Sequence, residues 1–297
     1  MQEQFEDFSL SNMINDYLRK KGAVSDRDNT HIHPSEFHGC KRRIAYAYYQ
    51  ATGLIKVRDG AVKVDARLQR VFGNGHHVHD RFKSYLADPE FCGGTLLGWW
   101  QCRNWWHHLQ KGDHPRIFGT EEKIGIPLPK EPCECGCDKF EYVEVGVFDP
   151  EINMGGHVDT ILLVKEPVIV DYKSAMSRSF EKVISDPKPE HTTQMQLYLM
   201  MTGCRLGKFL YENKDTQTLK EINVVRDDDY VSYLRRRART LTWMIKHPTS
   251  PGTVQLPPRS SSLNPKSDPY PKLVINYKKT SRDCIECRFR KHCWNLK

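Results

Sequence analysis

Two short segments hold the side chains best suited to chemistry. The stretch GGHVD ends in the carboxylate of Asp159, and the stretch VDYK carries Asp171 and, two positions later, Lys173. Hydrolysis of a phosphodiester requires that developing charge be neutralised and a water be activated. Hard divalent cations such as Mg²⁺ or Mn²⁺ do both and prefer oxygen ligands. Asp159 and Asp171 are therefore candidate ligands, and the backbone carbonyl of Tyr172 can add a further oxygen.

The segment between the two carboxylates predicts how they meet. In a strand, residues two positions apart point to the same face, so the Lys173 ammonium lies beside Asp171 and can orient the water or offset charge on the phosphorane. The sequence TILLVKEPVIV is apolar with a turn at 165–167, which predicts a hairpin that brings Asp159 to Asp171. The alternative is that D-x-K is a common tripeptide of sheet edges. The hairpin and the two glycines before Asp159 favour the site.

The elements around these segments predict one fold class. Helices are expected at 36–53, 66–87, 189–203 and 227–247, and strands at 120–127, 139–148, 156–164, 167–172, 207–212 and 219–225. The Pro/Ser-rich stretch 248–271 predicts an extended loop. This order indicates an α/β or α+β fold with a central mixed β-sheet flanked by helices.

Composition narrows the setting. Of 297 residues, 38% are hydrophobic and 28% charged, no apolar run approaches the ~20 residues that cross a bilayer, and the acidic start is unlike a signal peptide. We expect a cytoplasmic protein of a bacterium or a phage-infected cell, with no membrane partner. The net charge of +8 fits DNA as a partner. Candidate DNA-binding residues are Lys41, Arg42, Arg43, Arg235, Arg236 and Arg237, although each run also fits a solvated helix face.

Ten cysteines are many for a reducing compartment, where close spacing favours metal over disulfides. Cys284, Cys287 and Cys293 form a C-x2-C-x5-C pattern near the end of the chain. A fourth ligand would complete a zinc site or an iron–sulfur cluster, and spacing alone does not choose between them.

A second group, Cys133, Cys135 and Cys137, includes a Cys-Gly-Cys turn of the kind found in metal knuckles. We expect a structural Zn²⁺ in an inserted hairpin, whose fourth ligand is one of Cys92, Cys102, His107 and His108. The alternative is a surface turn with free thiols. The nearby tryptophans, Trp99, Trp100, Trp105 and Trp106, could stack on unpaired bases or pack a core around the insertion.

With these motifs in order along the chain, the sequence resembles the PD-(D/E)XK nucleases, specifically their RecB-like branch. That branch includes the nuclease domains of bacterial helicase–nucleases, CRISPR-associated iron–sulfur exonucleases and many phage exonucleases. Asp159 matches the first acidic position, with Val158 before it in place of the usual proline, and Asp171-Tyr172-Lys173 matches the (D/E)-x-K motif. The sequence GHHVHD resembles the first motif, whose last histidine ligates metal. The resemblance thus implies this role for His79, with His76 and His77 as competitors.

The resemblance also assigns supporting parts. It implies a restriction-endonuclease-like core, and a downstream helix whose Gln194 and Tyr198 support the active site and contact DNA. It places Cys40 with the three C-terminal cysteines around a [4Fe–4S] cluster, which would join distant parts of the chain. The expected organisation is a helical region at 1–70, a nuclease core at 71–226 with a cysteine-containing insertion at about 91–140, and an iron–sulfur region at 227–297.

The function implied by this resemblance is a metal-dependent DNA nuclease. It favours an exonuclease that acts on single strands or DNA ends and leaves 5′-phosphate and 3′-hydroxyl products. The alternative is a non-catalytic DNA-binding or accessory subunit of a recombination, replication or CRISPR complex. The chain has no G-x-x-x-x-G-K-[ST] loop, so a helicase, like any recombination or CRISPR partner, would be a separate chain.

Overall fold

A five-stranded mixed sheet lies at the centre of the computed structural model, which describes residues 10–21, 27–56, 66–88, 96–104, 116–183, 187–247, 256–270 and 274–294. The strand order is β1-β7-β8-β9-β10, in which β8 and β9 run parallel and the other neighbours antiparallel. The bounds are β1 (Leu96–Leu97), β7 (Thr160–Leu163), β8 (Pro167–Ala175), β9 (Leu206–Asn213) and β10 (Leu219–Val225). The predicted mixed sheet flanked by helices is confirmed, and it is consistent with a restriction-endonuclease-like core.

The hairpin predicted between the two carboxylates forms as β7 and β8. Its register pairs Thr160 with Val170 and Leu163 with Pro167. Asp159 directly precedes β7, whereas Asp171 lies in the middle of β8, one residue beyond the last β7 partner. The hairpin therefore places both carboxylates at the same end of the β7–β8 pair.

Helix α8 (Pro189–Thr202) lies in the connection from β8 to its parallel neighbour β9 and follows α7 (Ser177–Val183). Proline occupies its first turn, where a missing N–H costs nothing. The helix ends at Gly203, whose φ of 82° is the left-handed cap conformation that glycine adopts without strain. Parallel strands need such a crossover, so this helix lies on one face of the sheet.

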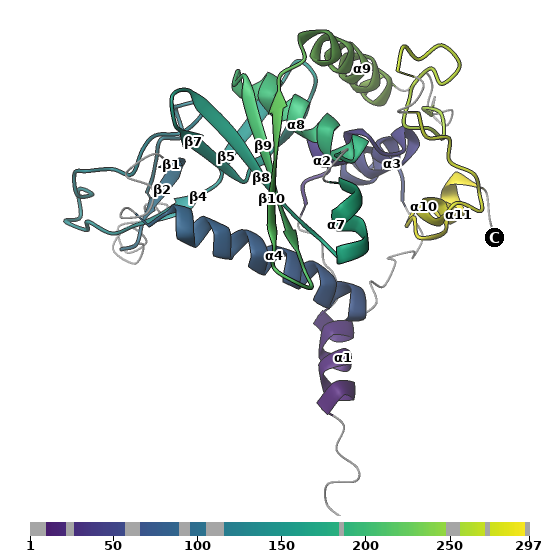
Figure 1. Cartoon of the computed structure of the whole chain (residues 1–297). Helices are drawn as coiled ribbons and strands as arrows, with labels where there is room; N and C mark the ends of the chain where they lie inside the picture. Colours follow the sequence, from purple (N-terminus) through teal and green to yellow (C-terminus); the bar gives the residue numbers. More distant parts are fainter. Residues whose placement is uncertain are drawn as a thin grey trace, which may run out of the picture.

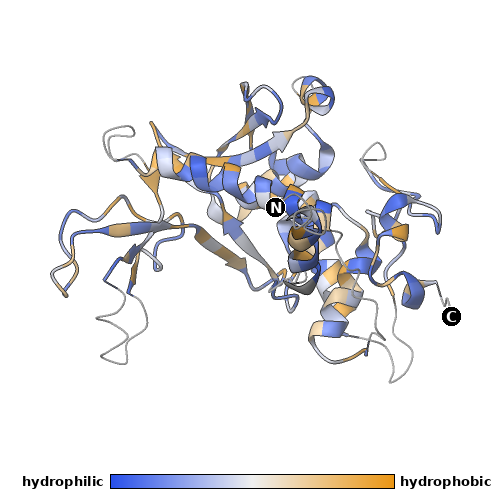
Figure 2. Cartoon of the chain, turned by 90° about the horizontal axis from the view of Figure 1, so that it is seen from below, coloured by the Kyte–Doolittle hydropathy of each residue, from blue (hydrophilic) through white to orange (hydrophobic). Residues whose placement is uncertain are grey.

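Helices cover both faces of the sheet (Figure 1). On one face, Val78 and Phe82 of α4 (Ala66–Leu86) pack on Val170 and Tyr172 of β8. On the other face lies α8, and α9 (Asp228–Lys246) packs on α8. Figure 2 shows hydrophilic and hydrophobic residues interspersed along the helices, as expected where one side of a helix meets the sheet and the other meets water.

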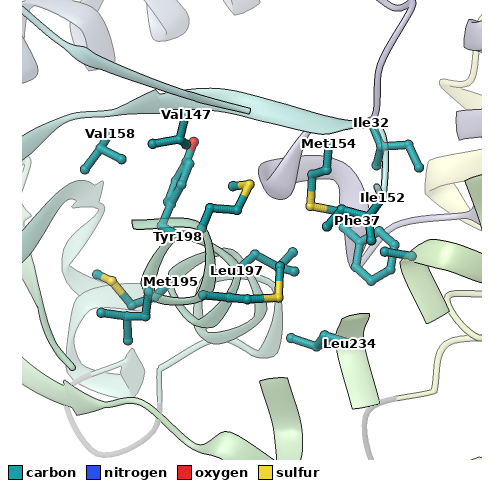
Figure 3. Close-up of a cluster of buried hydrophobic side chains, with 14 of the residues drawn as sticks. Ile32, Phe37, Val147, Ile152, Met154, Val158, Met195, Leu197, Tyr198 and Leu234 are labelled. Atoms are coloured by element: carbon teal, nitrogen blue, oxygen red, sulfur yellow. The ribbon is translucent and has the colours of Figure 1, made fainter. Parts of the chain in front are cut away.

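The larger hydrophobic core lies between α8 and the hairpin of β5 (Val145–Asp149) and β6 (Met154–Val158). Figure 3 shows Tyr198 extending from α8 toward this hairpin, with its hydroxyl beside Val147. A Cβ on Gly156 would lie 2.9 Å from the Tyr198 hydroxyl oxygen, so glycine is required for this approach. The second glycine of the Gly-Gly pair thus admits the tyrosine that sequence resemblance assigns to the site.

A separate three-stranded sheet, ordered β3-β2-β4, precedes the β5–β6 hairpin along the chain. It consists of β3 (Ile117–Phe118), β2 (Trp99–Cys102) and β4 (Phe140–Val143). The strand predicted at 120–127 is wrong. Gly119 and Gly125 adopt φ angles of 86° and 73° that turn the chain, and Ile126 contributes an isolated bridge to Gly98.

The helix predicted at 36–53 is divided into α2 (Pro34–Phe37) and α3 (Lys41–Ala51), with Cys40 as the residue that caps α3. The C-terminal part of the chain returns to this point. The Lys41 amide donates to the Ser260 carbonyl at 2.9 Å, and Phe289 packs against Tyr46 with ring centres 5.6 Å apart. The short helices α10 (Arg282–Ile285) and α11 (Arg290–Cys293) therefore lie near α3 (Figure 1).

At the N-terminal end of the described chain, α1 (Leu10–Lys21) contacts α4. Within the described ranges, none of the helices combines the length and the apolar character that a membrane span requires.

Replacement of Phe82 by alanine tests the packing of α4 on the sheet. Phe82 is buried and its ring stacks on Tyr172 at 5.3 Å, so its removal leaves a cavity beneath the proposed site. We expect the free energy of unfolding, measured in urea, to fall by about 3 kcal/mol. Phe72→Ala, at an exposed position of the same helix, is the control and should cost less than about 1 kcal/mol. Equal losses for the two variants would contradict this packing.

Candidate active site

The backbone of β8 connects the two carboxylates. The Tyr172 amide donates a hydrogen bond to Oδ2 of Asp159 at 3.0 Å, and Asp171 is the preceding residue. In an extended strand, the N–H and C=O of one residue face the same edge, so the Tyr172 carbonyl also faces the side on which Asp159 lies. The arrangement places two carboxylates and one backbone carbonyl, all oxygen donors, around one end of the hairpin.

Lys173 reaches back to the second carboxylate. Its Nζ lies 2.6 Å from Oδ2 of Asp171 and donates to Oε1 of Gln194 at 3.4 Å. Gln194 projects from α8, and Tyr198 follows one turn later on the same side of the helix. The ammonium is therefore positioned by the strand that carries it and by the helix that covers that strand.

His79 approaches from the opposite face of the sheet. Its Nδ1 lies 3.4 Å from Oδ2 of Asp159, and its ring meets Tyr172 edge to face, with ring centres 5.6 Å apart. His76 and His77 are exposed, whereas His79 is half-buried. Of the three histidines in this motif, the structure places His79 beside the carboxylates.

Two residues that the sequence did not indicate fix the backbone of Asp159. The Thr160 hydroxyl donates to the Asp159 carbonyl at 2.7 Å and shares a 2.7 Å hydrogen bond with the Tyr172 hydroxyl. The Tyr142 hydroxyl donates to the same carbonyl at 3.2 Å. Thr160 could have been suspected because it follows Asp159. Tyr142 lies on β4 and only the fold brings it near, so no local pattern marks it.

The site separates the charge states of its two carboxylates. Burial raises the pKa of Asp171 to about 6, with the negative charge of Asp159 adding to the effect and Lys173 opposing it. For Asp159, burial also acts to raise the pKa, but hydrogen bonding to His79 and its charge, together with Lys173, bring it below the usual value. Asp159 is thus held ionised, whereas Asp171 accepts a proton readily when no cation is bound.

The pKa values of His79 on α4 and His191 on α8 are shifted in opposite directions. Burial acts to lower the pKa of His79, but the Asp159 carboxylate outweighs it and the pKa is raised. Burial lowers the pKa of His191 to about 3, helped by the charges of Lys173 and Lys188, and its Nδ1 lies 2.7 Å from the Tyr211 hydroxyl. His191 is therefore neutral at physiological pH and acts as a packed hydrogen-bonding partner beside the site.

The donor types suit a divalent cation, although the ligand atoms of His79, Asp159 and Asp171 do not all lie within 4.8 Å of one another. Two carboxylates, a backbone carbonyl and an imidazole are ligands that metal-assisted hydrolases use. Oδ2 of Asp171 is buried and, although it lies against the Lys173 ammonium, forms no hydrogen bond of good geometry within the described residues. A buried carboxylate oxygen in this condition is suited to a cation as its remaining partner.

The four cysteines that resemblance groups together are brought together by the fold. Burial raises the pKa of the Cys40 thiol, and the neighbouring Cys293 and Cys284 raise it further. Burial likewise raises the pKa of Cys287, again with contributions from Cys293 and Cys284. Arg259 donates from Nε to the sulfur of Cys293 at 3.3 Å. These thiols therefore lie near enough for their charges to act on one another.

Two cysteines of the second predicted group, Cys133 and Cys135, converge with Cys102. The sulfurs of Cys102, Cys133 and Cys135 all lie within 4.8 Å of one another, whereas Cys137 lies outside this spacing. Cys102, one of the four candidates for the missing ligand, lies at the end of β2. The other candidates, Cys92, His107 and His108, lie outside the described residues.

The basic residues divide into available and committed groups. Lys41 is fully buried, with its ammonium 4.1 Å from the centre of the Phe37 ring and donating to the Phe37 carbonyl. The prediction that Lys41 contacts DNA is therefore wrong in this structure. Arg235 pairs with Asp149 and Glu151, and Arg237 with Tyr233 and Asp268.

Three members of the predicted basic set remain available at least in part. Arg236 is exposed, Arg43 is exposed with its guanidinium 3.5 Å from the Glu36 carboxylate, and Arg42 is half-buried with its Nε donating to the Pro257 carbonyl at 2.8 Å. Their contact with DNA stays a prediction.

Of the four clustered tryptophans, Trp99 and Trp100 lie within the described residues. Trp100 is buried and donates its indole N–H to the Ile126 carbonyl at 2.9 Å, and Trp99 is half-buried against Gly146. Both pack the insertion, as the simpler of the two interpretations expected. Trp105 and Trp106 lie outside the described residues.

Comparison with known proteins yields only loose structural likeness. No known family model matches the sequence, and no curated protein is similar to it. The fold is similar to that of a protein named SSO0001, with 13% identity, 80% of this chain and 88% of that chain covered, and a TM-score of 0.40.

Two structures of an alkaline exonuclease, LHK-Exo from Laribacter hongkongensis, are similar at the same level. One is 22% identical over 35% of this chain and 56% of that chain, with a TM-score of 0.32. The other, in complex with dAMP, is 13% identical over 73% of this chain and 88% of that chain, with a TM-score of 0.42. At these scores the assignment of the site rests on the residues of this chain.

The raised pKa of Asp171 predicts how stability varies with pH in protein without added divalent cation. The fold shifts this pKa from 3.8 to about 6, so the folded state binds more protons than the unfolded state between these values. The free energy of unfolding should therefore fall as pH rises from about 4 to about 6 and be independent of this group above that. Urea unfolding of wild type and Asp171→Asn at stepped pH measures the effect.

Asp171→Asn should remove most of this fall, because its side chain does not ionise. Glu121→Gln, which changes an exposed carboxylate, is the control and should keep the wild-type profile. Parallel profiles for wild type and Asp171→Asn would show that Asp171 is not destabilised by its surroundings.

Proposed function

We propose that the chain is a metal-dependent DNA nuclease. The observation that carries the proposal is the convergence of Asp159, Asp171, Lys173 and His79 from two strands and a helix at one end of a hairpin. Structural ion pairs also bury charge, but they do not usually place two carboxylates together at the expense of a raised pKa. This arrangement is the one that a cation-assisted hydrolysis requires.

The residues have separate tasks in this proposal. Asp159, Asp171, His79 and the Tyr172 carbonyl would hold Mg²⁺ or Mn²⁺, which would supply charge neutralisation and lower the pKa of water. Lys173 holds its ammonium between Asp171 and Gln194, where it orients the nucleophile or offsets negative charge on the phosphate. Tyr198 and Gln194 fix the face of α8 that covers the site. Attack by water in line with the departing 3′ oxygen would yield a 5′-phosphate and a 3′-hydroxyl.

DNA as the substrate is supported by the surplus of basic residues and by the resemblance to RecB-like nucleases. The net charge of +8 favours a polyanion. Arg42, Arg43 and Arg236 are the members of the predicted set that remain available to phosphates. We further propose that the protein acts as an exonuclease on single strands or DNA ends, because this is the action that the resemblance to RecB-like exonucleases implies.

Matched pairs of variants test the nuclease. Asp171→Ala and Lys173→Ala should lower Mg²⁺- or Mn²⁺-dependent cleavage of labelled single-stranded DNA by at least about 100-fold, because each removes a group that acts on developing charge. Lys165→Ala, in the exposed turn of the same hairpin, should cleave like the wild type. His79→Ala should lose activity, whereas His77→Ala, on the exposed side of the same helix, should retain it.

Retention of cleavage by Asp171→Ala would overturn the assignment. Specific DNA binding by a wild-type protein that cleaves neither single- nor double-stranded DNA would instead favour the non-catalytic alternative. Digestion of 5′- and 3′-end-labelled DNA also tests the finer assignment. Shortening from an end supports exonuclease action, and internal cuts in circular single-stranded DNA contradict it.

We also propose that Cys40, Cys284, Cys287 and Cys293 hold a [4Fe–4S] cluster with a structural role. Support comes from the electrostatic influence of these thiols on one another across segments distant in sequence. A cluster here would clamp the start of α3 to the C-terminal segment, whose other links include the Lys41–Ser260 and Arg42–Pro257 hydrogen bonds and the packing of Phe289 on Tyr46. Cross-linking distant parts of a chain stabilises the fold by restricting the unfolded state.

Anaerobic purification tests this cluster. The wild-type protein should be brown and contain about four irons per chain. Cys287→Ser should lose most of the iron and unfold at a lower temperature, whereas Cys204→Ser, which changes a buried thiol outside both groups, should keep both. A colourless wild-type protein with zinc bound by these cysteines would contradict the cluster.

A further inference from the structure

The tip of the β3-β2-β4 sheet holds four cysteines that the nuclease chemistry does not use. Cys102 closes β2, whereas Cys133, Cys135 and Cys137 lie in the turn that precedes β4. Cys102 and Cys133 are buried, and Cys135 and Cys137 are half-buried. Cys102 of β2 is paired with Phe140 of β4, which brings the end of β2 and the turn before β4 together at this end of the sheet.

The spacing of the sulfurs is that of a metal site. Cys102 and Cys135 have their sulfurs 3.6 Å apart, and Cys133 joins them within 4.8 Å. A disulfide would need about 2.05 Å, whereas Zn–S bonds of about 2.3 Å place the sulfurs of a tetrahedral site about 3.8 Å apart. The observed separation matches the edge of a zinc tetrahedron and is too long for a bond between sulfurs.

The backbone around the thiols is also arranged for ligation. The Cys133 amide donates to the Cys137 carbonyl at 2.8 Å, and the Gly136 amide to the Cys133 carbonyl at 2.7 Å, which forms a tight knuckle. Gly136 has a φ of 79°, which the turn requires. The side-chain amide of Asn104 reaches the Cys135 sulfur at 3.8 Å. Donors of this kind stabilise thiolates in metal sites.

Cys137 is the remaining thiol of this turn. Its side chain contacts Cys102, although its sulfur lies outside the mutual 4.8 Å spacing of the other three. Among the described residues it is therefore the candidate for the fourth ligand.

We propose that Cys102, Cys133, Cys135 and Cys137 bind one structural Zn²⁺. This assignment is independent of the proposed nuclease activity and of the iron–sulfur cluster, whose cysteines lie near α10 and α11 on the far side of the molecule from β2 and β4 (Figures 1 and 2). The ion joins the end of β2 to the turn before β4.

The sheet that the ion would hold is small, with Trp100 and Trp99 as its packing residues. Its strands contain two to four residues each, too short for independent stability. Yet it carries Tyr142, whose hydroxyl holds the Asp159 carbonyl, and a Cβ at Gly98 would clash with the Tyr142 ring at 2.1 Å. Tyr142 lies opposite Trp100, two residues from Cys102. The zinc therefore stabilises the strand from which a positioning residue reaches the active site.

Metal analysis of anaerobically purified protein tests the proposal. The wild type, grown with zinc in the medium, should contain about one zinc per chain. Cys102→Ser and Cys135→Ser should lose most of it while retaining iron, Cys287→Ser should show the reverse, and Cys204→Ser should keep both metals. A zinc content in Cys102→Ser equal to that of the wild type would overturn the assignment of Cys102 as a zinc ligand.

A second measurement does not depend on the folding of variants. Wild-type protein depleted of zinc by a thiol-reactive mercurial, then reduced, should take up Co²⁺ and show the visible bands of a tetrahedral thiolate site. Hydrogen exchange of the amides in 96–104 and 116–143 should slow when Zn²⁺ is returned, while exchange in α9 is unchanged. Failure to bind Co²⁺ or Zn²⁺, or a Cys102–Cys135 disulfide in freshly purified anaerobic protein, would overturn the site.

Discussion

Asp159 and Asp171 lie close together in a place where little water screens them, and the surrounding structure offsets the resulting repulsion. Each carboxylate has its own partner: the Tyr172 amide and His79 face Asp159, whereas Lys173 faces Asp171. These partners come from β8 itself and from α4. The offset is incomplete, since the pKa of Asp171 stays raised. A site that remains short of positive charge is prepared for a cation.

The elements of the fold follow from this demand. The β7–β8 hairpin sets the two carboxylates at one end, α4 delivers the imidazole from one face of the sheet, and α8 delivers Gln194 to the lysine from the other face. Gly156 admits Tyr198 because any side chain there would meet its hydroxyl. The insertion contributes Tyr142 from outside the main sheet. Five separate segments thus meet at a single carboxylate pair.

The parts predictable from the sequence were those with local signals. The hairpin, α8 and α9 follow from periodicity and turn chemistry, and His79, Asp159, Asp171 and Lys173 follow from spacing and resemblance. Long-range packing decided the rest. The apolar residues of 120–127 suggested a strand, but two glycines with positive φ turn the chain there. Lys41 looked like a phosphate contact in a basic run, yet the return of the C-terminal segment buries it. Neither the contact of Tyr142 with Asp159 nor the position of Cys102 beside Cys133 and Cys135 is indicated by any local pattern.

The central claim is that the carboxylate pair holds a divalent cation, and anomalous diffraction from crystals grown with Mn²⁺ tests it most directly. The account predicts a manganese peak between Asp159 and Asp171, within bonding distance of His79 and the Tyr172 carbonyl, that is absent from crystals of Asp171→Asn. A fully occupied peak elsewhere in the protein with none at this pair, or an unchanged peak in Asp171→Asn, would contradict it.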